Sequence, residues 1–331
     1  MPKPRYAQIS AGETPYVHVV SRVVRRSFLC GTDEFSGKNY DYRRQWIEDE
    51  IIRLSGIFSL DVSAYSVMSN HYHIILHINL VRSKGWSDDE VIERWHQLFK
   101  GSMQSQNYMA GEKLDKSHKQ LLKTQVGEWR NRLTYISWFM RILNEKIARK
   151  ANKEDDCTGR FWEGRFKSQA LLDEKALMAC MVYVDLNPIR AKMAATPEKS
   201  AHTSVKKRCE AAKSTGRARG VVGKQPCGLE RFVGNPRQPM PEGLPYRLTD
   251  YLELVDWTGR QIREDKRGSI DKGLPEILAR LEIDEDDWIY MTQNFESSFK
   301  TLVGSVSKLR KACEALGYKR MPGRAACEWL F

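Results

Sequence analysis

The sequence predicts an α+β protein whose N-terminal part contains strands and helices in the order β-α-β-β-α-β. Two observations support this prediction: 41% of the 331 residues are hydrophobic, and apolar residues either alternate or recur at helical spacing in successive segments. This composition excludes a mostly disordered chain. At roughly 150 residues per domain, the length corresponds to about two domains.

Four segments are predicted to be strands of the core. Residues 16–24 form a β-branched run, and residues 59–68 and 71–78 alternate on either side of Ser69-Asn70, a polar pair typical of a hairpin turn. A further strand is expected within residues 159–172, where basic residues flank it.

Helices are predicted where apolar residues recur about every 3.6 positions. These segments are residues 40–54, 88–99, 133–151 and 174–185. Ser87 and Glu90 have the spacing of a capping box, which sets the start of the second helix. Residues 101–119 are polar and poor in helix formers, so we expect an inserted or mobile loop there.

Charge and composition divide the chain into three parts. Residues 1–200 contain the predicted core domain. Residues 201–246 carry nine Lys or Arg against three Asp or Glu, without sustained periodicity, which indicates a basic linker. Residues 247–331 are nearly neutral, with 14 basic and 15 acidic residues, and their helical patterns predict a small C-terminal helical domain.

The chain as a whole is strongly basic. It has 54 Lys or Arg and 42 Asp or Glu, a net charge of +12, which favours a polyanionic partner. No apolar run approaches the ~20 residues that span a bilayer, so no membrane contact is expected. The polar N-terminus and seven scattered Cys without a CxxC pair predict a cytoplasmic protein with reduced thiols.

The strand over residues 71–78 contains the sharpest candidate for chemistry. Alternation places His71, His73 and His77 on one face of the strand. Two imidazoles two residues apart can bind one divalent cation, although such a triplet by itself is more often coincidence. His77 is a third ligand, a residue that orients one, or a packing residue, and packing is favoured.

Three segments resemble one known family. His71-Tyr72-His73 after YSVMSN resembles the HUH motif of single-tyrosine transposases of the insertion-sequence-200-like superfamily. GRFWEGRFKSQ (159–169) and YVDLNPIRAKM (183–193) resemble segments of its REP-associated tyrosine transposase branch. The motifs occur in the family's order within residues 15–197. The resemblance implies a ferredoxin-like fold, a four-stranded antiparallel sheet with helices on one side.

The resemblance also implies an activity. In such a transposase, His71 and His73 would bind Mg²⁺ or Mn²⁺ at a scissile phosphate of single-stranded, hairpin-bearing DNA. A tyrosine on a late helix would attack this phosphate and leave a 5′-phosphotyrosine bond and a free 3′-OH. Members of the family work as dimers or as monomers with appended domains, so the resemblance implies either a homodimer or a monomer with an appended C-terminal part.

The nucleophile is the open question in the sequence. Aligned on GRFWEGRF, the family's usual tyrosine position falls near Ile147. Tyr135, on the same predicted helix, is the predicted catalytic residue, with Tyr108 of the polar segment as an alternative. If neither serves, the chain is an inactivated DNA-binding derivative or a metal-dependent phosphodiesterase that uses water.

Basic residues near the later motifs are the predicted DNA contacts. Arg160, Trp162, Arg165 and Lys167 interleave cations with an aromatic ring, a composition typical of phosphate contact and base stacking. Trp162 is either such a stacking platform or a core residue. The remaining predicted phosphate contacts are Arg22 and Arg190.

Overall fold

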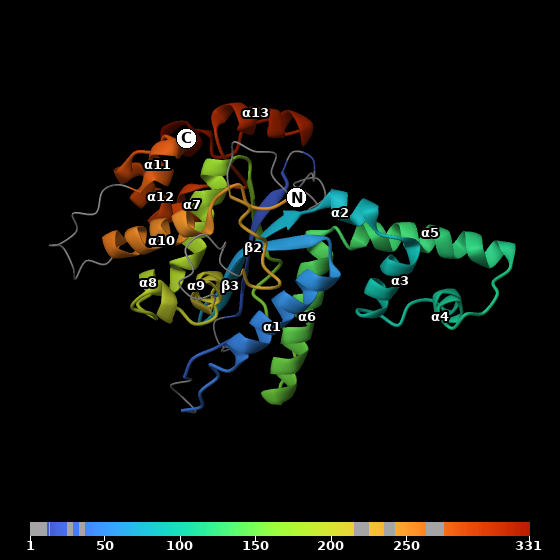
Figure 1. The fold of residues 1–331 in the computed structure, drawn as a ribbon. Coiled ribbons are helices and arrows are strands. Elements are labelled where there is room, and N and C mark those ends of the chain that lie inside the picture. Colours follow the sequence, from blue (N-terminus) through green and yellow to red (C-terminus); the bar gives the residue numbers. More distant parts are fainter. Residues whose placement is uncertain are drawn as a thin grey trace.

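The computed structural model describes residue 12 and residues 14–24, 29–32, 37–214, 225–234, 242–262 and 275–331, which are built around a five-stranded sheet (Figure 1). The strands follow the order β2-β3-β1-β4-β5. They are β1 (Tyr16–Arg22), β2 (Leu60–Val67), β3 (His71–Ile78), β4 (Lys167–Leu171) and β5 (Leu302–Val303). The first four pair antiparallel, as predicted, and the C-terminal part adds β5 parallel to β4.

The predicted hairpin is formed by β2 and β3. Its turn closes with the backbone N–H of Met68, which donates to the carbonyl oxygen of His71 at 2.8 Å. β1 pairs with the other edge of β3, so that Arg22 lies opposite His71. Because side chains alternate along a strand, Tyr72 points to one face of the sheet, and His71 and His73 point to the other.

The face that carries Tyr72 is covered by α1 (Arg43–Ile57) and α6 (Ile136–Glu154), which contact each other. Both helices correspond to predicted amphipathic segments. Their buried apolar residues include Ile47, Ile51 and Leu54 of α1 and Phe139, Leu143 and Ile147 of α6. The side chain of Asn144 on α6 accepts a hydrogen bond from the Tyr72 hydroxyl at 2.5 Å, which ties the helix to this face.

Helices cover the opposite face of the sheet as well, whereas the prediction placed helices on one face. α7 (Glu174–Asp185) packs on β2, β3 and β4, and every residue from 176 to 185 is buried. The C-terminal helices are α10 (Leu248–Ile262), α11 (Glu276–Leu281), α12 (Glu285–Ser298), α13 (Val306–Ala315) and α14 (Arg324–Leu330). They share one hydrophobic core with α7, which α10 and α12 contact, and therefore do not form a separate domain.

The described part of residues 201–246 is packed on the body and is not a linker. It follows α8 (Asn187–Arg190) and a short 3-10 helix (Pro197–Lys199), and it contains α9 (Ser204–Ser214). The guanidinium of Arg208 is fully buried and donates to the carbonyl oxygens of Ser63 and Glu230 at 2.8 and 3.1 Å. Arg217 and Arg219 of the predicted basic segment lie outside the described residues.

An arm of helices projects from the body between β3 and α6 (Figure 1). It consists of α2 (Leu80–Gly85), α3 (Asp88–His96), α4 (Met103–Met109) and α5 (Lys116–Arg132). The capping box of Ser87 and Glu90 is confirmed at the start of α3. The loop predicted for residues 101–119 is wrong in part, because α4 and the start of α5 lie there. Within the described residues, no helix combines the length and apolar character that a membrane span requires.

Candidate metal centre

The two predicted metal ligands lie side by side at one end of β3. The ring centroids of His71 and His73 are 4.9 Å apart. His71 is partly exposed at the end of the strand, whereas His73 is fully buried beneath α7. The pair therefore extends from the interior to the surface at the end of the sheet.

A chain of hydrogen bonds determines which nitrogen of His73 carries the proton. The side-chain amide of Gln169 donates to the carbonyl oxygen of Phe299 at 2.8 Å, so its oxygen faces Nδ1 of His18, also at 2.8 Å. His18 must then donate through Nδ1 and accept through Nε2. Nε2 of His18 lies 2.9 Å from Nδ1 of His73, which places the His73 proton on Nδ1.

This relay leaves Nε2 of His73 as a free lone pair. The atom is buried and has no hydrogen-bond partner in the described part of the chain. A buried polar atom without a partner costs about 1–3 kcal/mol, which coordination of a cation would offset. Neutral imidazole nitrogen is a ligand of divalent metals, so His71 and His73 fit such an ion.

The surroundings keep both rings neutral. Burial and the nearby Arg22 lower the pKa of His71 to about 4. Burial, together with the neighbouring His18 and His71, holds the pKa of His73 well below its usual range. Metal binding requires the deprotonated ring, so at neutral pH neither histidine has to lose a proton before it coordinates.

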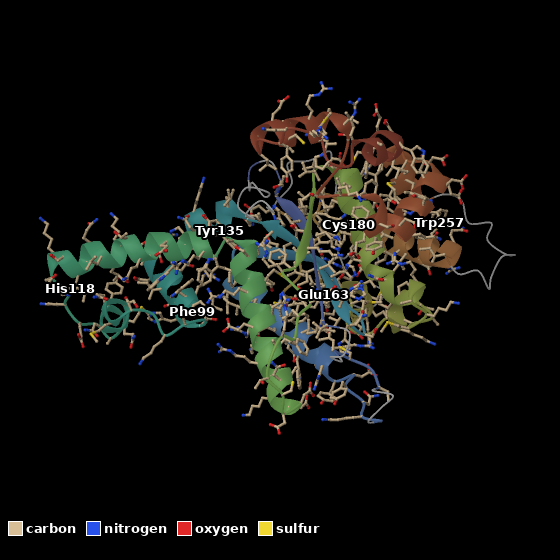
Figure 2. The ribbon with its side chains drawn as sticks, turned by 180° about the vertical axis from the view of Figure 1, so that it is seen from behind. Phe99, His118, Tyr135, Glu163, Cys180 and Trp257 are labelled. Carbon is tan, nitrogen blue, oxygen red and sulfur yellow. The ribbon has the colours of Figure 1, made fainter. Side chains whose placement is uncertain are left out.

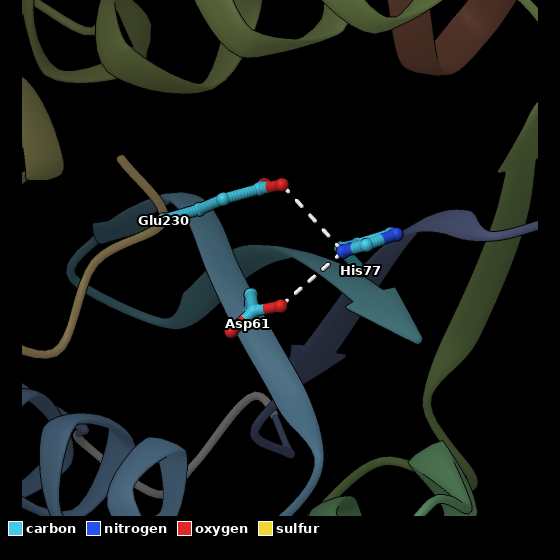
Figure 3. Close-up of side chains that lie close together, drawn as sticks. All are labelled: Asp61, His77 and Glu230. Atoms are coloured by element: carbon cyan, nitrogen blue, oxygen red, sulfur yellow. Dashed lines mark hydrogen bonds and ion pairs between the residues drawn. The ribbon is translucent and has the colours of Figure 1, made fainter. Parts of the chain in front are cut away.

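His77 belongs to a different cluster at the other end of the hairpin. It lies four residues beyond His73, about 13 Å along the strand. Its Nδ1 is 3.2 Å from a carboxylate oxygen of Asp61 and 3.5 Å from one of Glu230, and Figure 3 shows the three side chains pointing toward one another. The three donor atoms form a second group that could hold a metal ion, beside a cavity of about 400 Å³.

Hydrogen bonds already occupy much of this second group. Glu230 accepts from the hydroxyls of Tyr16 and Ser63 at 2.9 and 2.6 Å, and Arg82 pairs with Asp61. Burial acts to lower the pKa of His77, but the Asp61 hydrogen bond and Glu230 outweigh it and raise the pKa. The cluster thus favours a protonated His77, which competes with a cation for the two carboxylates.

The structure places a tyrosine that the sequence analysis did not assign beside the histidine pair. Tyr183 lies on α7, and its ring centroid is 5.7 Å from that of His73 and 6.2 Å from that of His18. The guanidinium carbon of Arg190 lies 4.1 Å from the ring centroid. Burial raises the pKa of Tyr183 to about 12, and Arg190 acts in the opposite direction. Tyr183 is the first residue of the YVDLNPIRAKM segment, and its place in that motif was the sequence signal that could have identified it as a functional residue.

Tyr135 does not approach the pair. It precedes α6, where the carbonyl oxygen of Leu133 accepts from the N–H of Ser59 at 2.9 Å, and Ser59 accepts from Asn79 beyond the end of β3. This end of β3 is seven residues from His71, or about 23 Å. Figure 2 shows Tyr135 at the junction of α6 with the arm.

The helix on which a nucleophile was expected lies on the wrong face of the sheet. Ile147 of α6 packs in the core on the Tyr72 side, whereas His71 and His73 point to the α7 side. The alternative, Tyr108, lies on α4 of the arm and donates to Asp89 at 2.8 Å.

Most of the predicted DNA-binding residues lie near the histidine pair. The charges of Arg22, Arg190 and Lys167 all act on the pKa of His71. The backbone N–H of Glu163 donates to the carbonyl oxygen of Arg22 at 2.8 Å, which brings the exposed Arg160 and Arg165 to the same end of the sheet. Two of these cations have protein partners as well: Lys167 lies 3.5 Å from Glu296, and Arg190 donates to carbonyl oxygens of α12.

Trp162 is a core residue, which contradicts its prediction as a stacking platform. It is 9% exposed, its indole N–H donates to the carbonyl oxygen of Asn144 at 2.8 Å, and its ring meets that of Tyr72 edge to face. A ring packed in this way supports α6 and the sheet and is not offered to an unpaired base.

No protein-family model matches the chain. No curated protein matches it either. Among solved structures, the chain is similar to one described as "Structure of the REP associates tyrosine transposase bound to a REP hairpin". The identity is 12%, the TM-score is 0.37, and the match covers 73% of this chain and 100% of that chain.

Proposed function

We propose that this protein is a metal-dependent DNA-cleaving and rejoining enzyme of the single-tyrosine transposase type. His71 and His73 hold Mg²⁺ or Mn²⁺, and Tyr183 replaces Tyr135 as the nucleophile. The substrate is single-stranded DNA that bears hairpins, as the three sequence motifs imply.

The observation that carries this proposal is the position of Tyr183. Its ring lies 5.7 Å from His73, the residue whose Nε2 is buried without a partner in the described structure. We propose that this side chain, which is 5% exposed and lies on the same face of the sheet, reaches a phosphate held at the metal. A nucleophile, a metal-ligand pair and nearby cations are the components that phosphodiester cleavage requires.

The chain's own groups account for the transfer. The bound cation, when present, polarises a phosphoryl oxygen. The hydroxyl oxygen of Tyr183 forms a bond to phosphorus as the bond from phosphorus to the 3′ oxygen breaks, and the phenol proton is balanced by the proton that completes the 3′-OH. Arg190 favours the phenolate that develops on the attacking oxygen. The products are a 5′-phosphotyrosine bond and a free 3′-OH, and the reverse reaction rejoins the strand.

Basic side chains supply affinity for the DNA backbone near this site. Arg22, Arg160 and Arg165 are exposed at the same end of the sheet as His71. Lysine and arginine contacts to phosphate position nucleic acid without reading its sequence. We therefore propose that these residues, with Lys167 and Arg190, hold the strand across the histidine pair.

Covalent trapping tests the proposal. The protein is incubated with labelled single-stranded hairpin DNA and Mn²⁺, and any adduct is located by a denaturing gel and peptide mapping. We expect an adduct on Tyr183 that Tyr183→Phe abolishes while the variant still binds the DNA. An adduct on Tyr135 or Tyr108 would refute the assignment of Tyr183. Cleavage without an adduct would indicate water as the nucleophile, and binding without cleavage would indicate an inactivated derivative.

A further inference from the structure

We propose that the helical arm is a second DNA contact, which binds the phosphates of the hairpin stem through Lys116, Lys119 and Lys123 of α5. This inference rests on the proposed function, since it assumes that a hairpin-bearing strand is the substrate. It assigns a role to the arm, which has no part in the proposed cleavage at the histidine pair.

The arm has a direction that the fold determines. Arg130, near the end of α5, donates to the carbonyl oxygens of Ser83 and Trp86 at 2.9 and 2.6 Å and pairs with Asp88 at 2.8 Å. The rings of Trp95 on α3 and Trp129 on α5 stack with centroids 5.4 Å apart. These contacts join α5 to α2 and α3 at the root of the arm, so its outer half is held away from the body (Figures 1 and 2).

The outer half of α5 carries a basic stripe, defined as Lys116, Lys119 and Lys123. At about 100° per residue, these positions fall within roughly 60° of the helix circumference. All three side chains are exposed, and none forms an ion pair with the described part of the chain. Three cations on one side of a helix without carboxylate partners form a surface complementary to a polyanion.

The carboxylates at α5 and its exposed apolar residue Leu121 lie off this stripe. Asp115 caps the helix and accepts from the ring of His118 at 2.8 Å, and Glu128 pairs with Arg132. Leu121, which is 53% exposed, lies on roughly the opposite side of the helix. A protein partner would be expected to bury such an apolar residue, so the stripe itself favours a phosphate backbone.

The position of the arm sets a minimum size for a DNA that reaches it. The arm leaves the body just after Ile78, and His71 lies seven residues away along β3, which is about 23 Å. At about 3.4 Å per base pair, this distance corresponds to about seven base pairs. A short stem bound at the histidine pair therefore cannot touch the stripe, whereas a long stem can.

The test compares two hairpins with the same loop and single-stranded tail and with stems of about 4 and about 14 base pairs. The variant is K116Q/K119Q/K123Q, and the matched control is K308Q/K311Q/K319Q, which removes three exposed lysines from the C-terminal helical part. Dissociation constants are measured over a range of salt concentrations, and circular dichroism confirms that each variant is folded.

On the long stem, losing three phosphate contacts should reduce the slope of log affinity against log salt by about 2.7. Between about 50 and 200 mM salt, the native protein should then lose about 40-fold more affinity than the stripe variant. The stripe variant on the short stem, and the control variant on either stem, should each show the slope of the native protein on the same DNA. An unchanged slope on the long stem, or an equal loss on both stems, would overturn the proposal.

Other outcomes separate this inference from the function on which it rests. If the native protein cleaves both hairpins but the stripe variant behaves like it, only the role of the arm is refuted. If the native protein binds neither hairpin, both proposals fail. A stripe variant that loses self-association in light scattering, with DNA affinity unchanged, would assign the arm to a second copy of the chain and refute the DNA contact.

Discussion

Replacing His18 with phenylalanine should weaken Mn²⁺ binding at the histidine pair, although His18 is not itself a proposed ligand. His18 is fully buried and provides the acceptor that holds the His73 proton on Nδ1. Without that acceptor, the proton can move to Nε2, the nitrogen proposed to bind the metal. A phenylalanine ring keeps the edge-to-face packing that His18 makes with Tyr183 and Phe295.

The expected loss is about 10- to 100-fold in metal affinity, the range typical of groups that orient a metal ligand. This corresponds to about 1.4–2.7 kcal/mol of binding free energy. Mn²⁺ binding is measured by calorimetry and by electron paramagnetic resonance without DNA, so that the result does not depend on activity. Nitrogen NMR of the imidazoles reports the His73 tautomer directly.

Two further variants make this prediction refutable. His18→Gln retains an oxygen that can accept from His73, so it should bind Mn²⁺ more tightly than His18→Phe. His77→Phe, at the other end of β3, should leave Mn²⁺ binding at its native value. The reasoning fails if His18→Phe binds as tightly as the native protein while His73→Ala does not bind. Loss of binding in His77→Phe would move the metal to the Asp61, His77 and Glu230 group.

Three other predictions concern pH, packing and charge. Because the pKa of His71 is lowered to about 4, protons should displace Mn²⁺ only as the pH falls toward 4. Loss of half of the Mn²⁺ binding already near pH 6.5 would contradict a His71 ring that is neutral at that pH. Trp162→Ala should lower the free energy of unfolding, measured by urea denaturation, by about 3–5 kcal/mol, because it leaves a cavity beside Tyr72. A change below about 1 kcal/mol would indicate that Trp162 is exposed and not part of the core. R165Q/K167Q should reduce the salt slope of DNA binding by about 1.4 on short and long stems alike, because two contacts to a single strand are lost. An unchanged slope would exclude both residues from the phosphate contacts.

Local sequence patterns were sufficient to predict the strands of the hairpin and the helices α1 and α6 that cover the Tyr72 face of the sheet. The hairpin at Ser69-Asn70, the capping box at Ser87 and the helices that became α1 and α6 each depend on neighbours within a few residues. Period and capping are encoded at that range. These elements therefore appear in the structure close to their predicted bounds.

Features that depend on distant contacts were not predictable in the same way. The apolar residues all around α7 indicate burial on every side, but they do not identify the C-terminal helices as the covering layer. Arg208 contributed to the charge that suggested a linker, yet it is buried against two carbonyl oxygens. The nucleophile was sought on α6 because an alignment gives a position along the chain but not the face of the sheet to which it points.

The relay that prepares His73 also links the site to the order in which the chain is synthesised. Gln169 is held by the carbonyl oxygen of Phe299, 130 residues later, and β5 follows immediately at Leu302–Val303. Translation supplies residues from the N-terminus onward, so the histidines, Tyr183 and the basic end of the sheet all leave the ribosome before this anchor exists. A nascent chain thus lacks the arrangement that fixes the His73 tautomer until the segment around Phe299 has emerged. This dependence delays the proposed strand-cutting activity until the segment around Phe299 has been translated.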